Sequence, residues 1–343
     1  MAAGRLHIDL AVPPAQALAR GRSVLDALSE ASPVVAYGAE MSAASVVLGA
    51  YQHAPHALRG SAVATLAAPV LRRRSGGGAL MASEGVAYFA LGLRDASVLL
   101  PCPPGRILNR NVRGLLAGMR ALGIPAYYFG RDFVSVGTAP APAIAIGWDE
   151  AADGRVLLEF FIACTTTFVL PPELNGYPYR QSPVWGGKVV TTLRDQGRGE
   201  SAGEVLASIA EGYTRGFGVE FDRGPFPAEW FALAATREPA IVVDPRDEGG
   251  LRWSRPHEEA IGFVSAGAAF DGRGAFTAIE LGGDFYQQRE RARDLSGRLV
   301  GVQAEAAAIG AAVDAIYGTP GAIEGVRSLT TLREAILNTM ALG

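Results

Sequence analysis

One ten-residue run limits what this chain can fold into more than any other segment: Leu71-Arg72-Arg73-Arg74-Ser75-Gly76-Gly77-Gly78-Ala79-Leu80. Glycine lacks a Cβ atom, so three glycines in a row reach backbone conformations that other residues avoid and let a ligand lie against bare N–H groups. Arginine adds a permanent charge and a planar set of donors that suit phosphate and carboxylate. The run indicates a strand end that leads into an anion-binding turn, although a surface loop with solvated arginines explains it about equally well.

Two neighbouring arginines of this run, Arg73 and Arg74, are the candidates for contact with a ligand. Successive side chains of an extended segment point to opposite faces. We therefore expect one of the two to face the site and the other to face solvent.

The composition indicates a globular protein with a sizeable core. The 343 residues are 49% hydrophobic and 19% charged, which is enough for one large or two medium domains. The net charge of −3 argues against a nucleic-acid binder held by bulk charge. The N-terminus has no apolar signal segment, and no stretch approaches the ~20 apolar residues of a membrane span. We expect a cytoplasmic protein that binds neither nucleic acid nor a membrane.

Lysine, cysteine and histidine limit the chemistry further. Lys188 is the only lysine, and the two cysteines, Cys102 and Cys164, do not form a disulfide framework. Cys164 lies on a predicted buried strand without a basic neighbour, which favours a structural thiol over a nucleophile. His53 and His56 lack flanking metal ligands, and we interpret them as surface histidines.

Hydrophobic periodicity and turn residues predict a mixture of helices and strands. Ser201, followed three residues later by Glu204, has the pattern of a helix capping box. Residues 139–142 alternate alanine and proline and should break regular structure, and residues 171–187 form a long irregular loop. The predicted helices cover residues 18–31, 110–122 and 201–215, and the predicted strands cover 44–49, 86–93, 126–129, 133–136, 143–147 and 155–166.

The chain divides at a segment rich in Pro, Asp, Glu, Gly and Arg. Residues 239–255 have the composition of a linker, so we expect one domain over residues 1–238 and a second over 256–343. The second domain should contain two strands, at 261–270 and 274–281, and then three helices. The predicted fold class is α+β.

Several segments, taken in chain order, resemble the lipoate–protein ligase branch of the biotin and lipoate ligase superfamily. Residues 45–52 are similar to the family's strand and turn that end in glycine, a variable stretch and glutamine. Residues 73–79 resemble its lipoyl-adenylate loop, and residues 130–133 resemble its short Gly-Arg-Asn-Asp turn with one position missing. Residues 282–285 are similar to part of its accessory domain.

The resemblance implies a catalytic domain of mixed β-sheets flanked by helices, with a small α+β accessory domain. It also implies an enzyme that joins a carboxylic acid to ATP as an acyl-adenylate and then passes the acyl group to an amine, either a carrier-protein lysine or a small molecule. Arg73 and Arg74 would be catalytic, Lys188 could reach the site from the long loop, and Asp132 would hold Mg²⁺. The nucleotide or acyl-adenylate would contact Ser75, Gly76, Gly77, Gly78, Ala79, Arg131, Asp132 and Gly147.

Three segments depart from the family pattern. The family has a lysine on the strand that follows the Gly-Arg-Asn-Asp turn, but residues 139–147 here contain neither lysine nor arginine. Losing one oxyanion donor of this kind raises a reaction barrier by about 3–4 kcal/mol. Residues 80–85 lack the family's aromatic-His-Asp sequence, and residues 158–162 lack its His-Gly pair.

Three functions are compatible with these patterns. The first is an adenylate-forming ligase whose acid need not be lipoate. The second is a catalytically inactive binding or partner protein with a ligase fold. The third is an acyltransferase that uses Cys164 as a nucleophile, as a thiol with an adjacent base can do.

Overall fold

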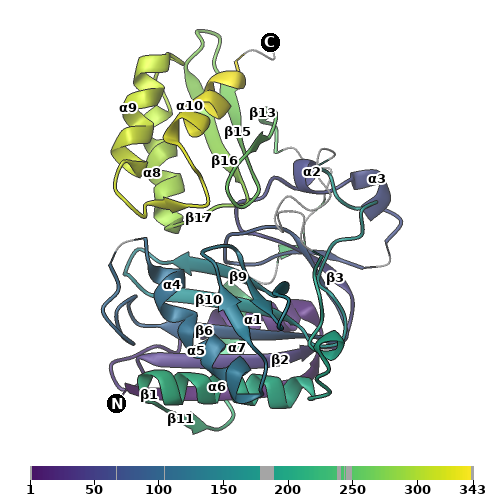
Figure 1. The fold of residues 1–343 in the computed structure, drawn as a ribbon. Helices are drawn as coiled ribbons and strands as arrows, with labels where there is room; N and C mark the ends of the chain where they lie inside the picture. The colour runs from purple at the N-terminus through teal and green to yellow at the C-terminus, as the bar shows by residue number, and fades with distance from the viewer. Residues whose placement is uncertain are drawn as a thin grey trace.

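An eight-stranded mixed sheet forms the framework of the larger part of the molecule (Figure 1), with strand order β11-β1-β2-β6-β10-β9-β8-β7. Strand β1 pairs in parallel with β2 and β11, and the other pairs are antiparallel. This computed structural model describes residues 2–66, 68–103, 105–177, 189–237, 241–242, 244 and 249–340. The strands are β1 (Ala2–Val12), β2 (Val34–Met41), β6 (Val86–Leu93), β7 (Ala126–Tyr128), β8 (Phe133–Val136), β9 (Ala141–Glu150), β10 (Val156–Ala163) and β11 (Val219–Arg223).

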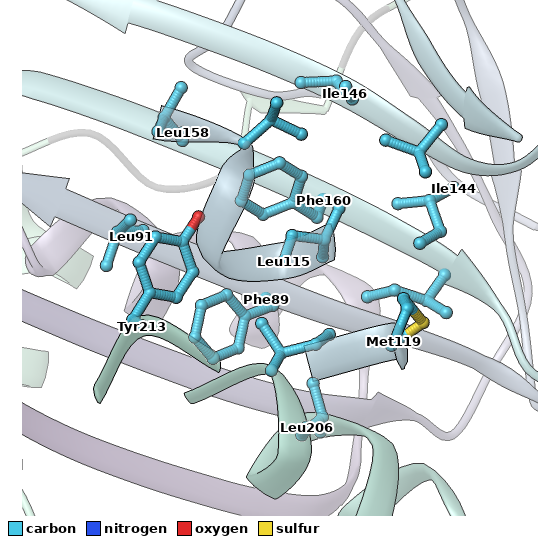
Figure 2. Close-up of a cluster of buried hydrophobic side chains, with 14 of the residues drawn as sticks. Phe89, Leu91, Leu115, Met119, Ile144, Ile146, Leu158, Phe160, Leu206 and Tyr213 are labelled. Atoms are coloured by element: carbon cyan, nitrogen blue, oxygen red, sulfur yellow. The ribbon is translucent and has the colours of Figure 1, made fainter. Parts of the chain in front are cut away.

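Helices cover both faces of this sheet. On one face, α4 (Ile107–Asn111), α5 (Arg113–Ala121) and α6 (Ala202–Phe217) pack on the strands, and Figure 2 shows the apolar side chains between them. Helix α1 (Pro14–Ser23) packs on the other face, where it also contacts α7 (Ala228–Arg237). None of the described helices is long and apolar enough to span a membrane.

Helices α5 and α6 approach each other closely because glycines lie at their crossing. A Cβ atom on Gly212 would lie 2.2 Å from the carbonyl oxygen of Gly114, and one on Gly118 would lie 2.5 Å from that of Ser208. The close crossing holds α5 and α6 together over the middle of the sheet.

A second, four-stranded sheet has the order β12-β4-β3-β5 and carries the arginine–glycine run between β4 and β5. Two short helices, α2 (Ala54–Ala57) and α3 (Gly60–Val63), connect β3 to β4. The strands are β3 (Ser45–Leu48), β4 (Val70–Arg72), β5 (Leu80–Ala82) and β12 (Ile241–Val242), and a 3-10 turn, η1 (Arg194–Gln196), precedes α6.

The C-terminal unit, residues 252–340, packs three helices against one face of a small sheet (Figure 1). Strand β15 pairs with β13, β14 and β16. A separate pair, β17 (Tyr286–Gln287) with β18 (Ile323–Glu324), lies beside the larger unit. The remaining elements are β13 (Arg252–Trp253), β14 (His257–Glu258), β15 (Phe263–Phe270), β16 (Phe276–Gly283), α8 (Arg289–Leu299), α9 (Ala306–Tyr317) and α10 (Leu329–Asn338).

The predicted α+β class is confirmed, with mixed sheets flanked by helices. The expected break at residues 139–142 is confirmed for 139–140, which form a turn, but was wrong for 141–142, because β9 begins at Ala141. The β8–β9 register shift next to Pro142 accommodates its missing N–H. The first helix spans Pro14–Ser23 rather than 18–31. The division of the chain at 239–255 stays a prediction; within that segment, β12 pairs with β4 and β13 pairs with β15.

Candidate functional site

The glycine loop, residues 75–78, lies where both sheets of the larger unit meet the C-terminal unit. The Gly76 amide donates to the Trp148 carbonyl on β9 (3.1 Å), and the Gly77 amide donates to the Phe285 carbonyl of the C-terminal unit (3.3 Å). The Ser75 carbonyl accepts the Ala50 amide from the turn after β3 (2.8 Å). Three segments that are far apart in the chain therefore fix this loop.

Two further glycines, Gly49 and Gly147, let these segments approach the loop. A Cβ atom on Gly147 would lie 2.1 Å from the Ser75 hydroxyl oxygen, and one on Gly49 would lie 2.0 Å from the Gly77 carbonyl oxygen. Both distances are too short for a real contact. The structure brings Gly147 against the loop, and its contact with a nucleotide stays a prediction.

Arg73 is buried beneath the loop and supports it from inside. Its Nε donates to the Ser75 hydroxyl (3.1 Å), and one terminal nitrogen donates to the carbonyls of Gly76 (2.8 Å) and Gly78 (3.0 Å). Burial lowers the pKa of Arg73, and the nearby Glu159 acts in the opposite direction. The guanidinium therefore holds the loop in shape through Nε and one of its two terminal nitrogens.

Glu159, on β10, is a residue that the sequence reasoning missed. Its carboxylate accepts the Ser75 amide (3.0 Å) and the hydroxyl of the buried Tyr88. The amides of Ser75, Gly76 and Gly77 thus all donate to groups of the protein. The only available signal was one acidic residue in the otherwise apolar run of residues 156–163.

Arg74 lies on the outer side of the loop, partly exposed, and is held by a buried carboxylate. Its Nε lies 2.6 Å from Asp149, and Nε of Arg289, at the start of α8, lies 3.7 Å from the same oxygen. Arg289 also donates to the Arg74 carbonyl (3.1 Å). Arg22, at the end of α1, has its pKa lowered to about 10 by burial and by the charges of Arg74 and Arg289. These three arginines, 22, 74 and 289, form the arginine cluster.

Asp132 is buried behind the loop. Desolvation raises the pKa of its carboxyl well above the ordinary range, although Arg131 and Arg73 oppose the shift. A cavity of about 10 Å³ separates Asp132 from Gly78 and Ala79, which leaves room for about one water molecule. Arg131 lies next to Asp132, with its Nε 3.9 Å from the carboxylate.

The surroundings of Asp132 do not fit a Mg²⁺ site. Magnesium requires an octahedral set of oxygen ligands and usually keeps several water molecules, whereas the cavity beside Asp132 has room for about one. Within the described part of the chain, no group of three or more His, Cys, Asp or Glu residues could hold a metal ion.

Strand β9 offers no cation to the site. Its residues at 143–146 are Ala, Ile, Ala and Ile, all buried in the apolar cores. Figure 2 shows Ile144 and Ile146 among the side chains under α5. Lys188, the predicted alternative, lies outside the described residues, as do residues 178–187 of the predicted loop.

Cys164 and His53, two residues that the sequence analysis considered, are both buried. Cys164 is buried, and desolvation raises the pKa of its thiol to about 12, so the reactive thiolate is strongly disfavoured. The interpretation of His53 as a surface residue was wrong, because its ring is buried and stacks on Trp253 at 3.8 Å.

Comparison with known proteins identifies the fold. No family model and no curated protein sequence matches the chain. The crystal structure of LipL1 of P. falciparum in complex with lipoate matches with a TM-score of 0.68 and 11% identity, covering 97% of this chain and 99% of that one.

Two further lipoate ligases match the chain over a smaller part of its length. The bipartite lipoate protein ligase of Thermoplasma acidophilum has a TM-score of 0.59 at 16% identity and covers 69% of this chain and 92% of its own. Lipoate-protein ligase A, crystallised with ATP, has a TM-score of 0.54 at 15% identity, covering 69% and 94%. The chain therefore has the fold of the lipoate–protein ligases, as its motifs predicted.

Proposed function

We propose that this chain is an ATP-dependent ligase that binds ATP and a small carboxylic acid, forms an acyl-adenylate and transfers the acyl group to an amine. The amine belongs to a carrier-protein lysine or to a small molecule. The fold supports the proposal, since one ligase with this fold was crystallised with ATP and another with lipoate. The acid need not be lipoate, because three segments around the site depart from the family pattern.

The arginine cluster is the observation that carries the proposal. Arg22 comes from α1, Arg74 directly precedes the glycine loop, and Arg289 comes from α8. Asp149 is the buried acid between Arg74 and Arg289. The repulsion between the guanidiniums is relieved when an anion binds, and ATP carries several negative charges. Arginine is also the side chain best suited to bind two phosphate oxygens through parallel hydrogen bonds.

The cluster compensates for the lysine that β9 lacks. In phosphoryl transfer, positioning and charge neutralisation provide most of the catalysis. A carboxylate oxygen bonds to the α-phosphorus while the bond to the β-phosphate oxygen breaks and pyrophosphate leaves. The amine nitrogen then bonds to the acyl carbon, AMP leaves, and the amine proton passes to solvent. Positive charge on the outer side of the loop favours the first step.

The loop amides must be released before they can contact a phosphate. The Gly77–Phe285 hydrogen bond, at 3.3 Å, is the longest of the three that the amides of residues 75–77 make. We expect it to break first, because it joins the loop to the C-terminal unit.

Trapping with hydroxylamine tests the proposal. The protein is incubated with ATP, hydroxylamine and a panel of aliphatic and aromatic acids, and hydroxamates are detected by mass spectrometry. We expect a hydroxamate from at least one acid, with a rate at least ~10-fold lower in Arg74→Gln, because removing a charged contact of about 1.5–3 kcal/mol has that effect. Arg273→Gln, in an exposed turn, is the matched control. Equal rates in the two variants would contradict the assigned role of Arg74.

A second candidate is a catalytically inactive binding protein. It is favoured by one observation: the amides of Ser75, Gly76 and Gly77 are already satisfied within the protein. Such a protein would bind a non-hydrolysable acyl-AMP analogue without turnover. Hydroxamate formation by the wild-type protein would eliminate this candidate.

A further inference from the structure

A second cavity, of about 610 Å³, lies between the turn after β3 and the C-terminal unit. Residues 50–54 and Arg72 line one side, and residues of β16 and α8 line the other. We call it the interunit cleft. Its volume is within the range of small-molecule binding pockets, roughly 300–1,000 Å³.

Arg72 lies in the cleft as a mostly buried cation. One terminal nitrogen donates to the carbonyls of Gly49 (2.9 Å), Ala50 (3.3 Å) and Gln52 (2.7 Å), which anchors the guanidinium to the turn. Glu280 lines the same cleft and raises the pKa of Arg72 against the lowering effect of burial. Among the described residues, however, no carboxylate lies within ion-pair distance of Arg72. A guanidinium held in this way presents its remaining donors to an incoming anion.

His53 adds a second unsatisfied group to the lining. It is only 9% exposed, and neither ring nitrogen has a hydrogen-bond partner. Burial lowers the pKa of His53 to about 3, with smaller effects from His56 and Arg72, so the ring is neutral at physiological pH. Buried polar atoms without partners are costly and are rare in native proteins. His53 lines the cavity, so a ligand there would lie beside this neutral ring, whose nitrogen atoms are shielded from solvent.

The shape of the guanidinium favours a carboxylate as the anion. Among the described residues of the lining, Arg72 and Arg293 are the cations and Glu280 and Asp244 are the acids. A carboxylate can pair with Arg72 through two parallel hydrogen bonds. The apolar part of a ligand would contact Tyr51, Leu251, Ile279 and Leu281.

The cleft is separate from the glycine loop, although both touch the same turn. A Cβ atom on Gly49 would lie 2.0 Å from the Gly77 carbonyl oxygen, so the two segments are in direct contact and no passage runs between them there. On the other side of the turn, Arg72 holds the carbonyls of Gly49 and Ala50.

We propose that the interunit cleft binds a small monocarboxylate with an apolar body, its carboxylate paired with Arg72. This site is distinct from the glycine loop and does not depend on ligase activity.

Calorimetric titration with three matched probes tests the proposal. Octanoate carries one negative charge, octanamide carries none, and octyl phosphate carries up to two. We expect octanoate to bind at least ~10-fold more tightly than either of the others. Equal affinity for octanamide would show that no cation recognises the head group, and no binding of octanoate, phenylacetate or benzoate at millimolar concentration would overturn the site altogether.

Two variants locate the binding site. Arg72→Gln removes the cation, and Ala292→Trp fills the cleft from α8 without touching the hydrogen bonds of Arg72. We expect each to weaken octanoate binding at least ~10-fold, whereas Ala311→Trp, on the exposed side of α9, leaves it unchanged. Retained binding in a folded Ala292→Trp protein would place octanoate elsewhere and refute the proposal. Hydroxamate formation with ATP is measured separately, so failure here is distinguishable from failure of the ligase proposal.

Discussion

Arg73 and Arg74 are neighbours in the chain, but they have different structural roles. Arg73 turns inward and satisfies the carbonyls of Gly76 and Gly78, so its charge stabilises the loop itself. Arg74 turns outward, where Asp149 holds it beside Arg289. The expectation that one of the two faces the site and the other faces solvent was wrong for the second part, because Arg74 is also mostly covered and pairs with Asp149. Arg73 supports the loop, and we assign the ligand to Arg74.

The close contact at Gly147 provides a test of the loop packing. In Gly147→Ala, the new Cβ atom would lie 2.1 Å from the Ser75 hydroxyl oxygen and 2.9 Å from the Ser75 Cβ. Overpacking of this kind typically lowers the free energy of unfolding by about 1–3 kcal/mol, as urea denaturation can measure. Gly216→Ala is the control, because that glycine lies in α6 with nothing within 4 Å. The control should gain about 0.5–1 kcal/mol, and an equal gain in both variants would contradict the described packing.

At the scale of single elements, α6 depends on its N-terminal cap. The Ser201 hydroxyl accepts the Glu204 amide (3.3 Å), and the Glu204 carboxylate accepts the Ser201 amide (2.8 Å). Ser201→Ala should therefore lower the free energy of unfolding by about 1 kcal/mol. Ser97→Ala is not a suitable control, because that hydroxyl also accepts a backbone amide. Ser42→Ala, at an exposed position outside the helices and strands, is suitable. No difference between the two variants in urea denaturation would mean that α6 does not need this cap.

Local sequence patterns predicted the helices and strands that have a regular hydrophobic spacing or a recognisable capping residue. Strands β6 and β8 match their predictions to the residue, and the capping box of α6 is present. Strand β1 escaped prediction because its burial does not alternate cleanly, although it lies within the main sheet. Strand β2 is buried on both faces, so its sequence shows no alternation either.

The parts of the candidate site that a single short segment forms were predictable from the sequence. The position of the glycine loop and the glycine at 147 followed from motifs in the sequence. Glu159 and Tyr286 did not, because their partners, Ser75 and Ile146, lie 84 and 140 residues away in the chain. Such pairs depend on the tertiary fold, and no local pattern specifies them.

At the scale of the whole molecule, hydrogen bonds from residues 283–286 join the C-terminal unit to the candidate site. The Gly283 amide donates to the Tyr51 carbonyl (2.9 Å), and the Tyr286 hydroxyl donates to the Ile146 carbonyl (2.8 Å). Asp284 accepts hydrogen bonds from the Gln52 side chain and from the Phe263 amide. The glycine loop is therefore completed by residues of both units.

Asp284 should make the stability of this junction depend on pH. Desolvation raises its pKa from an ordinary value of 3.8 to about 7 in the folded protein. The native state thus binds more protons than the unfolded state between these values, so its contribution to stability is complete below pH about 4 and is lost as the pH rises to about 7. Asp284→Asn should lack this dependence. We expect the stability of the variant relative to wild type to rise from pH 4 to pH 7 in urea denaturation; a constant difference would contradict a raised pKa.

The central claim is that a chain with this fold, lacking a lysine on β9, still activates a carboxylic acid with ATP through its arginine cluster. The most direct measurement is the exchange of radiolabelled pyrophosphate into ATP by the wild-type protein in the presence of a broad panel of carboxylic acids. We expect exchange that requires an acid. Its rate should fall at least ~10-fold in Arg74→Gln, because one charged contact is lost. Exchange that is absent with every acid, or that is unchanged in Arg74→Gln, would contradict it.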